Sequence, residues 1–466
     1  MTDILKGKTN QVLIGMSLPI GLGMLSTFLF QIVDTYFVSK LGSSALAALS
    51  FSSTIYLILI SLYIGLSIGV SIIIGQSVGR SDMDKVHKTT WVALTLSSLI
   101  SILISAVSIF FIDKIFTGLG AQADILPLIR TYTIPVLIGM PLLTFGIIAG
   151  GILRASGNIK KPEIVMVIAG VLNLIFDYAL IFGIWGLPEM GIQGAAYATV
   201  ISWIFAFIGM TFLLMKDKLL EFSKKAEDSI LAIVHEIFKL GLPTILTQII
   251  GPATITFLTY LLAKQSSMAV AAFGVISRIE MLLLIGILAL STAITPFVAQ
   301  NSGAKAYKRI GEAITFGRKA ACCLGLFIFT ILFLFVDSIA TIFSIDSEVI
   351  SHTSNYFYII SISYIPYSIY LITTAIFNGM RKTLISLKIT IVKSVVFAIP
   401  LTLIGSFWNV NGIFIGLALA NILAGIYATI PMRKEIRKHH PALQKASVIK
   451  DYQNDIKWLL SKKKSN

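Results

Sequence analysis

Charged residues are scarce in this sequence, and their scarcity excludes an ordinary soluble domain. They make up 13% of the chain, whereas soluble proteins carry roughly a quarter, and the mean hydropathy is +0.89. The two cysteines, Cys322 and Cys323, are adjacent within an apolar run, which excludes a disulfide framework and fits two small buried hydrophobes. The sequence also lacks a phosphate loop, a metal-ligand spacing and a nucleophile motif. We therefore predict that the protein is not an enzyme and uses no cofactor.

The sequence contains long apolar runs with few charged residues. A helix needs about 20 apolar residues to cross a hydrocarbon core of roughly 30 Å, and these runs have that length. The first run is too long for a signal-peptide core, so we expect it to be a span. We predict an all-α polytopic membrane protein with twelve transmembrane helices. The runs fall near residues 10–39, 45–75, 87–112, 125–149, 161–185, 191–215, 236–263, 268–300, 312–336, 350–377, 383–405 and 410–433.

The basic residues predict the orientation of the chain. They gather before the first span and after every even-numbered span up to the tenth, whereas the other loops are mostly neutral or acidic. Because cytoplasmic loops carry the excess of Lys and Arg, both termini are expected in the cytoplasm and the protein in the cell (inner) membrane. The net charge of +15 is spread over these loops, so we expect no nucleic-acid partner.

The two halves of the sequence repeat each other at a shift of 224 residues. Pro19 matches Pro243, Tyr36 matches Tyr260, and the match continues without a gap over about sixty residues, which is specific for an internal repeat. Six spans in each half predict two six-helix lobes related by a pseudo-two-fold axis along the membrane normal. The predicted organisation is an N-lobe at 1–215, a cytoplasmic linker at 216–235, a C-lobe at 236–433 and a basic cytoplasmic tail at 434–466.

Two acids lie within spans of the first half only. Asp34 and Asp177 match Leu258 and Leu401 in the second half. An ionisable side chain within a span is costly and marks a functional site by default. Asp34 is expected roughly 8 Å inside the outer end of its helix, with Asp177 a turn deeper, at 1.5 Å per residue. Two carboxylates in one partly desolvated cavity oppose each other's ionisation, so one could exchange a proton near physiological pH.

Each of these positions also has a structural alternative. Asn173 lies one turn from Asp177 on the same face, within hydrogen-bonding reach, but an amide can also bridge helices without a coupling role. Asp34 could cap the outer end of its helix. Pro19 removes a backbone hydrogen bond and allows a bend in the first span, although a static kink shared with Pro243 is the alternative.

Further residues are candidates for substrate contact or gating. Arg278 and Glu280 are two residues apart in the eighth span and do not face each other, so we expect structural ion pairs with other helices, or else substrate contact. Lys393 in the eleventh span is another candidate, or it could snorkel. The last candidates could line a cavity for flat cations or simply pack, and they are Gln31, Tyr36, Met140 and Met281.

Five segments give the chain a resemblance to a known family. They are FQIVDTYFVSKLGSSALAAL at 30–49, IIIGQSVGR at 72–80, LRASGNIKKP at 153–162, NLIFDYALIFG at 173–183 and GIQGAAYAT at 191–199. From about residue 19 to residue 431, the chain resembles the multidrug and toxic compound extrusion (MATE) family.

The resemblance implies twelve spans in two six-helix lobes around a central cleft, and export of amphipathic organic cations in exchange for protons or sodium. It assigns coupling to Asp34, Asn173, Asp177 and Thr199, and the helix bend to Pro19. The acids that another branch uses in its seventh and tenth spans are absent here, so the chain is similar to the damage-inducible (DinF-like) branch.

These observations together predict a secondary active multidrug efflux antiporter, a monomer whose partners are small amphipathic organic cations and the lipid bilayer. Protonation of Asp34 and Asp177 would bend the first helix and release substrate. The same side chains with Asn173 and Thr199 could hold Na⁺ instead, and no other metal is expected.

Two other functions remain open. The first is a lipid-linked oligosaccharide flippase of the same superfamily, which would need a cationic cavity for pyrophosphate. The second is a receptor or scaffold, which gives no reason for two intramembrane acids confined to one repeat.

Overall fold

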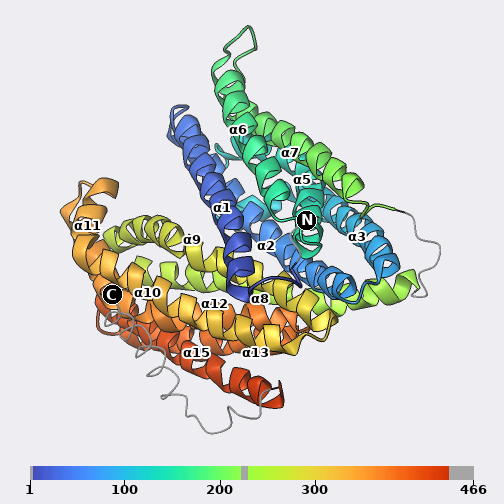
Figure 1. Ribbon diagram of the computed structural model, residues 1–466. Coiled ribbons are helices and arrows are strands. Elements are labelled where there is room, and N and C mark those ends of the chain that lie inside the picture. Colours follow the sequence, from blue (N-terminus) through green and yellow to red (C-terminus); the bar gives the residue numbers. More distant parts are fainter. Residues whose placement is uncertain (1–3, 222–228, 440–466) are drawn as a thin grey trace. The chain divides into compact units, whose positions relative to one another are not determined.

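The computed structural model describes residues 4–221 and 229–439, and every regular element in this part of the chain is helical (Figure 1). Within these described residues, twelve spans are long and apolar enough to cross a membrane, which confirms the predicted number. Lys224, Lys225 and most of the predicted basic tail, from residue 440 onward, lie outside the described residues.

The first half contributes six spans and one short helix. The elements are α1 (Thr9–Ser39), α2 (Ser43–Gly79), α3 (Met83–Phe110), α4 (Ile112–Gly118), α5 (Leu126–Ala155), α6 (Lys160–Phe182) and α7 (Gly191–Lys216). The short helix α4 was not predicted. The guanidinium of Arg130 donates two hydrogen bonds to Asp113 of α4, and this exposed pair holds the pKa of Asp113 below its ordinary value. The contact fastens α4 to the start of α5.

The second half contributes the other six spans, two of which are interrupted. The elements are α8 (Ile230–Ala263), α9 (Ser267–Gly303), α10 (Tyr307–Phe343), α11 (Ser347–Ile360), the 3₁₀ turn η1 (Ser361–Ser363), α12 (Tyr364–Gly379), α13 (Thr383–Ile391), the π-helical segment η2 (Val392–Ala398), α14 (Ile399–Ser406) and α15 (Val410–His439). Three consecutive elements, α11, η1 and α12, together form one span. The next three elements, α13, η2 and α14, together form another.

Prolines explain both interruptions. Pro366 and Pro400 lack the amide hydrogen that would bond to the carbonyl four residues earlier, which belongs to Ile362 and Val396 respectively. Ile362 lies in the 3₁₀ turn and Val396 in the π-helical segment. A local change of helix type accommodates the unpaired carbonyl, and such segments often occur at functional sites.

The fourth span of each half packs at the centre of that half. In the first half, α5 packs extensively against α2, α3 and α7, and in the second half α12 packs against α9, α10 and α15. The apolar segments of these two spans also have a larger share of buried residues than those of the other spans. The two halves therefore resemble each other in helix packing as well as in sequence.

The described chain forms two compact units whose bounds differ from the predicted lobes. Unit 1 contains residues 18–245, whereas unit 2 contains residues 4–17 together with residue 246 onward. The division therefore falls one residue before Pro19 in α1 and three residues after Pro243 in α8. The predicted linker at 216–235 is shorter than expected, because α7 continues to Lys216 and α8 begins at Ile230.

Specific contacts hold each exchanged segment in its unit. In unit 1, Thr244 of α8 donates to the Gly65 carbonyl at 2.6 Å, and a side chain at Gly65 would collide with the backbone of Ile245. In unit 2, Arg309 donates to the carbonyls of Gly7 and Ile4 at 2.6 and 3.0 Å. The start of α1 therefore packs with unit 2, and the start of α8 with unit 1.

Candidate functional site

The two intramembrane acids lie equally far from their helix ends. Asp34 is five residues before Ser39, where α1 ends, and Asp177 is five residues before Phe182, where α6 ends. The prediction that Asp177 lies a turn deeper is therefore wrong when depth is measured along each helix. Gly183 adopts a left-handed conformation with φ 68° and ends α6 before the apolar run is over.

The structure brings these acids together in unit 1. The carboxyl groups of Asp34 and Asp177 interact electrostatically, although they come from helices far apart in the sequence. Asp177 is fully buried, and Asp34 is partly buried with its Oδ1 enclosed. Two acids at one site, of which one is withdrawn from solvent, form a group that readily takes up a proton.

Hydrogen bonding at the pair is incomplete. Both carboxyl oxygens of Asp177, Oδ1 of Asp34 and Nδ2 of Asn173 have no hydrogen-bond partner among the described residues. The hydrogen bond expected between Asn173 and Asp177 is therefore not formed in this conformation. Each buried unpaired polar atom costs about 1–3 kcal/mol, and a charged one costs more. A proton or a small cation at this site would relieve that cost.

Two tyrosines that sequence reasoning missed border the acid pair. The hydroxyl of Tyr56 on α2 interacts with Asp34, and the hydroxyl of Tyr132 on α5 interacts with both Asp34 and Asp177. The available signal was the repeat itself, because Tyr132 matches Tyr356 at the shift of 224. A polar residue kept in both halves within a span was therefore visible before the structure.

Thr199 on α7 joins the same site through Tyr132. Its hydroxyl donates to the Ala195 carbonyl at 3.0 Å and also interacts with the Tyr132 hydroxyl. Four of the predicted coupling residues, Asp34, Asn173, Asp177 and Thr199, thus come from three helices of one unit and share one neighbourhood.

The other predicted contacts in unit 1 lie apart from the acid pair or in the core. Gln31 is exposed, and Met140 is buried in a core cluster with Tyr63 and Trp203. Tyr36 is exposed, with the Lys40 ammonium 4.8 Å from its ring centroid. The matching pair in the second half, Tyr260 and Lys264, has the same contact at 4.6 Å, which is typical of an aromatic and basic anchor at a membrane surface.

Unit 2 has a polar cluster of its own. Glu280 on α9 accepts hydrogen bonds from Tyr356 on α11 and Tyr364 on α12, at 3.0 and 2.9 Å to Oε1. These tyrosines are buried, and Glu280 is partly buried. Glu280 is therefore held by two hydroxyl groups, and no ion pair to it occurs within 4.0 Å among the described residues.

Lys393 lies in the π-helical segment η2 beside that cluster. Its ammonium is 4.9 and 5.4 Å from the ring centroids of Tyr367 and Tyr370, which stack on each other at 5.8 Å. Lys393 and Glu280 interact electrostatically without forming an ion pair within 4.0 Å. Arg278 is exposed, and no ion-pair partner for it is found in the part of the chain that the structure describes, contrary to the expected pairing.

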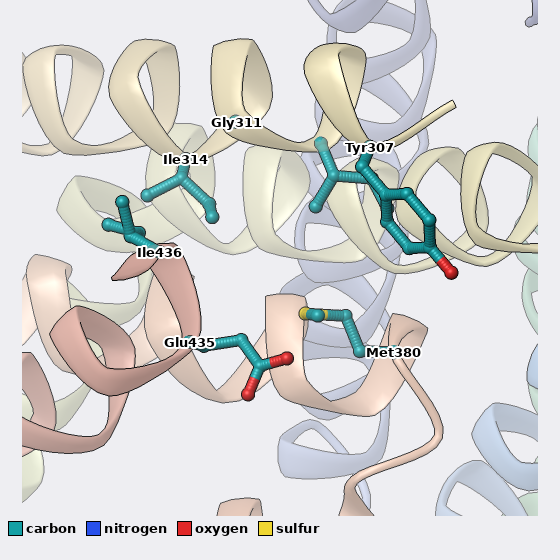
Figure 2. A pocket seen from close by; sticks show the side chains of 7 residues that line it. Tyr307, Gly311, Ile314, Met380, Glu435 and Ile436 are labelled. Atoms are coloured by element: carbon teal, nitrogen blue, oxygen red, sulfur yellow. The ribbon is translucent and has the colours of Figure 1, made fainter. Parts of the chain in front are cut away.

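No metal centre is found at these residues in the described part of the chain. The described residues include no group of three or more His, Cys, Asp or Glu side chains that could hold a metal ion. Figure 2 shows a small pocket in unit 2 between α10 and α15, where Glu435 is already paired with Lys382. Its lining residues are Tyr307, Ile310, Gly311, Ile314, Met380, Glu435 and Ile436. None of the candidate site residues lines that pocket.

Twelve spans, a repeated half and a buried pair of acids define a multi-pass membrane transporter rather than an enzyme. The profile of the MatE family matches residues 19–179 and 243–404, once in each half and at the repeat spacing found in the sequence. The chain belongs to the MatE family, which confirms the resemblance to multidrug and toxic compound extrusion transporters.

The related proteins are named either as an FAD transporter or as probable multidrug resistance proteins. A protein of Shewanella oneidensis named "FAD transporter" is 33% identical over 425 residues, covering 91% of this chain and 94% of its own. "Probable multidrug resistance protein YoeA" of Bacillus subtilis is 28% identical over 68% of this chain and 70% of its own. Among solved structures, the Vibrio cholerae MATE transporter VcmN in the bent form has a TM-score of 0.87 and 25% identity, covering 92% of this chain and 97% of its own.

Proposed function

We propose that this protein is a secondary active efflux antiporter of the cell (inner) membrane, with both termini in the cytoplasm, that exports amphipathic organic cations in exchange for protons. One observation supports this most strongly: Asp177 is fully buried, lies beside Asp34, and accepts no hydrogen bond from any other described residue. A carboxyl pair in that state binds a proton or a cation, but not both at once.

The proposed cycle follows from that competition. A proton entering from outside neutralises the acid pair, mainly at Asp34, and lets Asn173 and Asp177 form hydrogen bonds that they lack now, while Thr199 rearranges with them. The first helix bends near Pro19, where a backbone hydrogen bond is missing, and the substrate is released. Substrate binding from inside then favours release of the proton. Each ligand shifts the equilibrium only by its difference in affinity for the two conformations.

The test is efflux of ethidium from liposomes that hold the purified protein, with a proton gradient and a sodium gradient imposed separately. We expect the proton gradient to drive efflux, and Asp34→Asn to abolish it. Asp124→Asn is the matched control, because Asp124 is an exposed acid between spans and the chemical change is the same.

Three results would change the proposal. Efflux driven only by sodium would assign the acid pair to Na⁺ binding, and unimpaired efflux in Asp34→Asn would remove Asp34 from coupling altogether. Absence of ethidium transport under both gradients would favour a different substrate class, including a lipid-linked oligosaccharide.

The second candidate function is export of a flavin dinucleotide. The observation that favours it is the 33% identity, over nearly the whole chain, to the Shewanella oneidensis relative named "FAD transporter", which exceeds the 28% identity to YoeA. Efflux of FAD from the same liposomes, measured by flavin fluorescence, tests this candidate directly. Transport of FAD without ethidium would make it the principal function.

A further inference from the structure

The fifth span of each half carries a charged residue well inside its apolar segment, and the two charges are opposite in sign although their positions do not match in the repeat. In the first half, the fifth span is α6, which carries Asp177, and the corresponding second-half span is α13–η2–α14, which carries Lys393. Asp34 and Asp177 are replaced by Leu258 and Leu401 in the second half, and Lys393 matches the apolar Ala169 in the first. An acidic site and a basic site therefore occupy related places in units 1 and 2.

Lys393 has no close counter-ion. It forms no ion pair within 4.0 Å among the described residues, and its ammonium instead lies over the rings of Tyr367 and Tyr370. The nearby Glu280 already accepts two tyrosine hydroxyls. Lys393 and Tyr367 are each partly exposed. A partly desolvated ammonium that contacts ring faces and has only a more distant carboxylate, Glu280, attracts an anion more strongly than a surface lysine does.

The depth of Lys393 excludes a simple membrane-surface role. It lies ten residues after Thr383 and thirteen before Ser406, the ends of its span. At 1.5 Å per residue the nearer end is roughly 15 Å away, beyond the reach of a snorkelling lysine. A lipid phosphate at the surface is correspondingly distant, so a free anion that enters the protein is the better ligand.

We propose that unit 2 contains a binding site for an aromatic anion, in which Lys393 receives the phosphate or carboxylate and Tyr367 contacts the flat ring system. The tyrosine pair already shows stacked geometry at 5.8 Å, and Tyr367 is its partly exposed member. The proposal rests on the assignment as a transporter and names the substrate class of this second site. It does not depend on protons, because binding is measured without any gradient.

The experiment compares riboflavin 5′-phosphate with uncharged riboflavin, which share one ring system and differ in the phosphate. Binding to the purified full-length protein in detergent is followed by flavin fluorescence. We expect the phosphate ester to bind more tightly, and Lys393→Gln to weaken it about ten- to a hundredfold, to the level of riboflavin, because a charge-assisted contact is lost. Binding of riboflavin itself should not change. Tyr367→Ala should weaken both flavins.

Controls separate this site from folding and from general charge. Lys388→Gln removes the same charge from an exposed position of α13 and should leave binding unchanged, and Lys393→Arg should retain it. Ethidium efflux that persists in Lys393→Gln shows that the variant is folded. Equal affinity of wild-type protein for the two flavins, absence of flavin binding, or unchanged binding in Lys393→Gln would each overturn the site. Displacement of the flavin by added anionic phospholipid would also overturn it, because a lipid headgroup would then be the ligand.

Discussion

At the scale of the residue, the buried carboxyl group of Asp177 is energetically unfavourable in the described conformation. It is fully buried, it lies beside a second acid, and neither of its oxygens is hydrogen-bonded within the described residues. Such groups persist at functional sites because the ligand that satisfies them is part of the mechanism. Binding of a proton removes the energy penalty of the ionised form, and this gain in free energy can favour a different conformation.

We expect Asp177→Asn to be more stable than the wild type at high pH and equal to it at low pH. Asparagine keeps the shape and cannot ionise, and only the ionised carboxylate is strongly penalised when buried. The melting temperatures in detergent should coincide near pH 4, where an unfolded aspartate is also protonated, and Asp177→Asn should become higher by about 1–3 °C as the pH rises from about 4 to 9. Asp124→Asn serves as the control. A lower Tm for Asp177→Asn at pH 9 would show that the charge is satisfied in a way the structure does not reveal.

Tyr132→Phe tests the link between the acid pair and Thr199. The hydroxyl of Tyr132 interacts with Asp34, Asp177 and Thr199, so its removal should slow efflux about fivefold, which is the worth of one hydrogen bond. Tyr36→Phe makes the same change at an exposed position and should have no effect. Equal rates for the two variants would place Tyr132 outside the mechanism.

Sequence could locate the acids but not their neighbourhood. Asp34 and Asp177 were recognisable because charge is rare inside a span and absent at the matching leucines. Tyr56 and Tyr132 were not recognised, because tyrosine is common at membrane surfaces and its helix face is unknown before packing is known. Depth was also misjudged, since a single glycine in a left-handed conformation ends α6 within an apolar run.

At the scale of the element, two proline-containing helices contribute to both units. In α1 the change of unit falls one residue before Pro19, and in α8 it falls three residues after Pro243. The number and order of spans could be predicted from hydropathy. This exchange could not be, because it depends on side-chain contacts such as those of Arg309 with the carbonyls of Ile4 and Gly7.

Pro19→Ala should slow efflux while leaving substrate binding intact. Alanine restores the missing backbone hydrogen bond and stiffens α1 where the proposed cycle bends it. Pro243→Ala is the matched variant at the repeat position in α8, where no acid follows, and it should affect proton-driven efflux less. Rates of ethidium efflux in liposomes and ethidium affinity in detergent distinguish the two effects. Equal losses in both variants would indicate a general role of the prolines in packing.

Arg309→Ala should loosen the start of the chain. The side chain donates to the carbonyls of Gly7 and Ile4, and to Asn301 at 2.9 Å, so its loss removes the attachment of residues 4–17 to α10. Hydrogen exchange should rise in residues 4–17 and stay unchanged in α5. Lys308→Ala, next to it in sequence, is the control. Unchanged exchange in residues 4–17 would mean that other contacts hold that segment, such as the hydrogen bond that Thr9 donates to Glu312 of α10 at 2.6 Å.

At the scale of the whole molecule, each half depends on a segment from the other. Unit 2 includes residues 4–17, and unit 1 includes residues 230–245. We expect residues 1–221 expressed alone to aggregate in detergent, and co-expression with residues 222–466 to restore a single species. Size-exclusion chromatography checks this. A stable, monodisperse 1–221 fragment would show that the exchanged segments are not needed for folding.

The measurement that tests the antiport proposal most directly is proton release on substrate binding. Ethidium is added to the purified protein in weakly buffered detergent, and a pH-sensitive dye records the protons released. Competition at the acid pair predicts release of up to about one proton per bound substrate, lost in Asp34→Asn and retained in Asp124→Asn. Binding of ethidium to the wild-type protein without any proton release, or equal release from Asp34→Asn, would contradict coupling at Asp34 and Asp177.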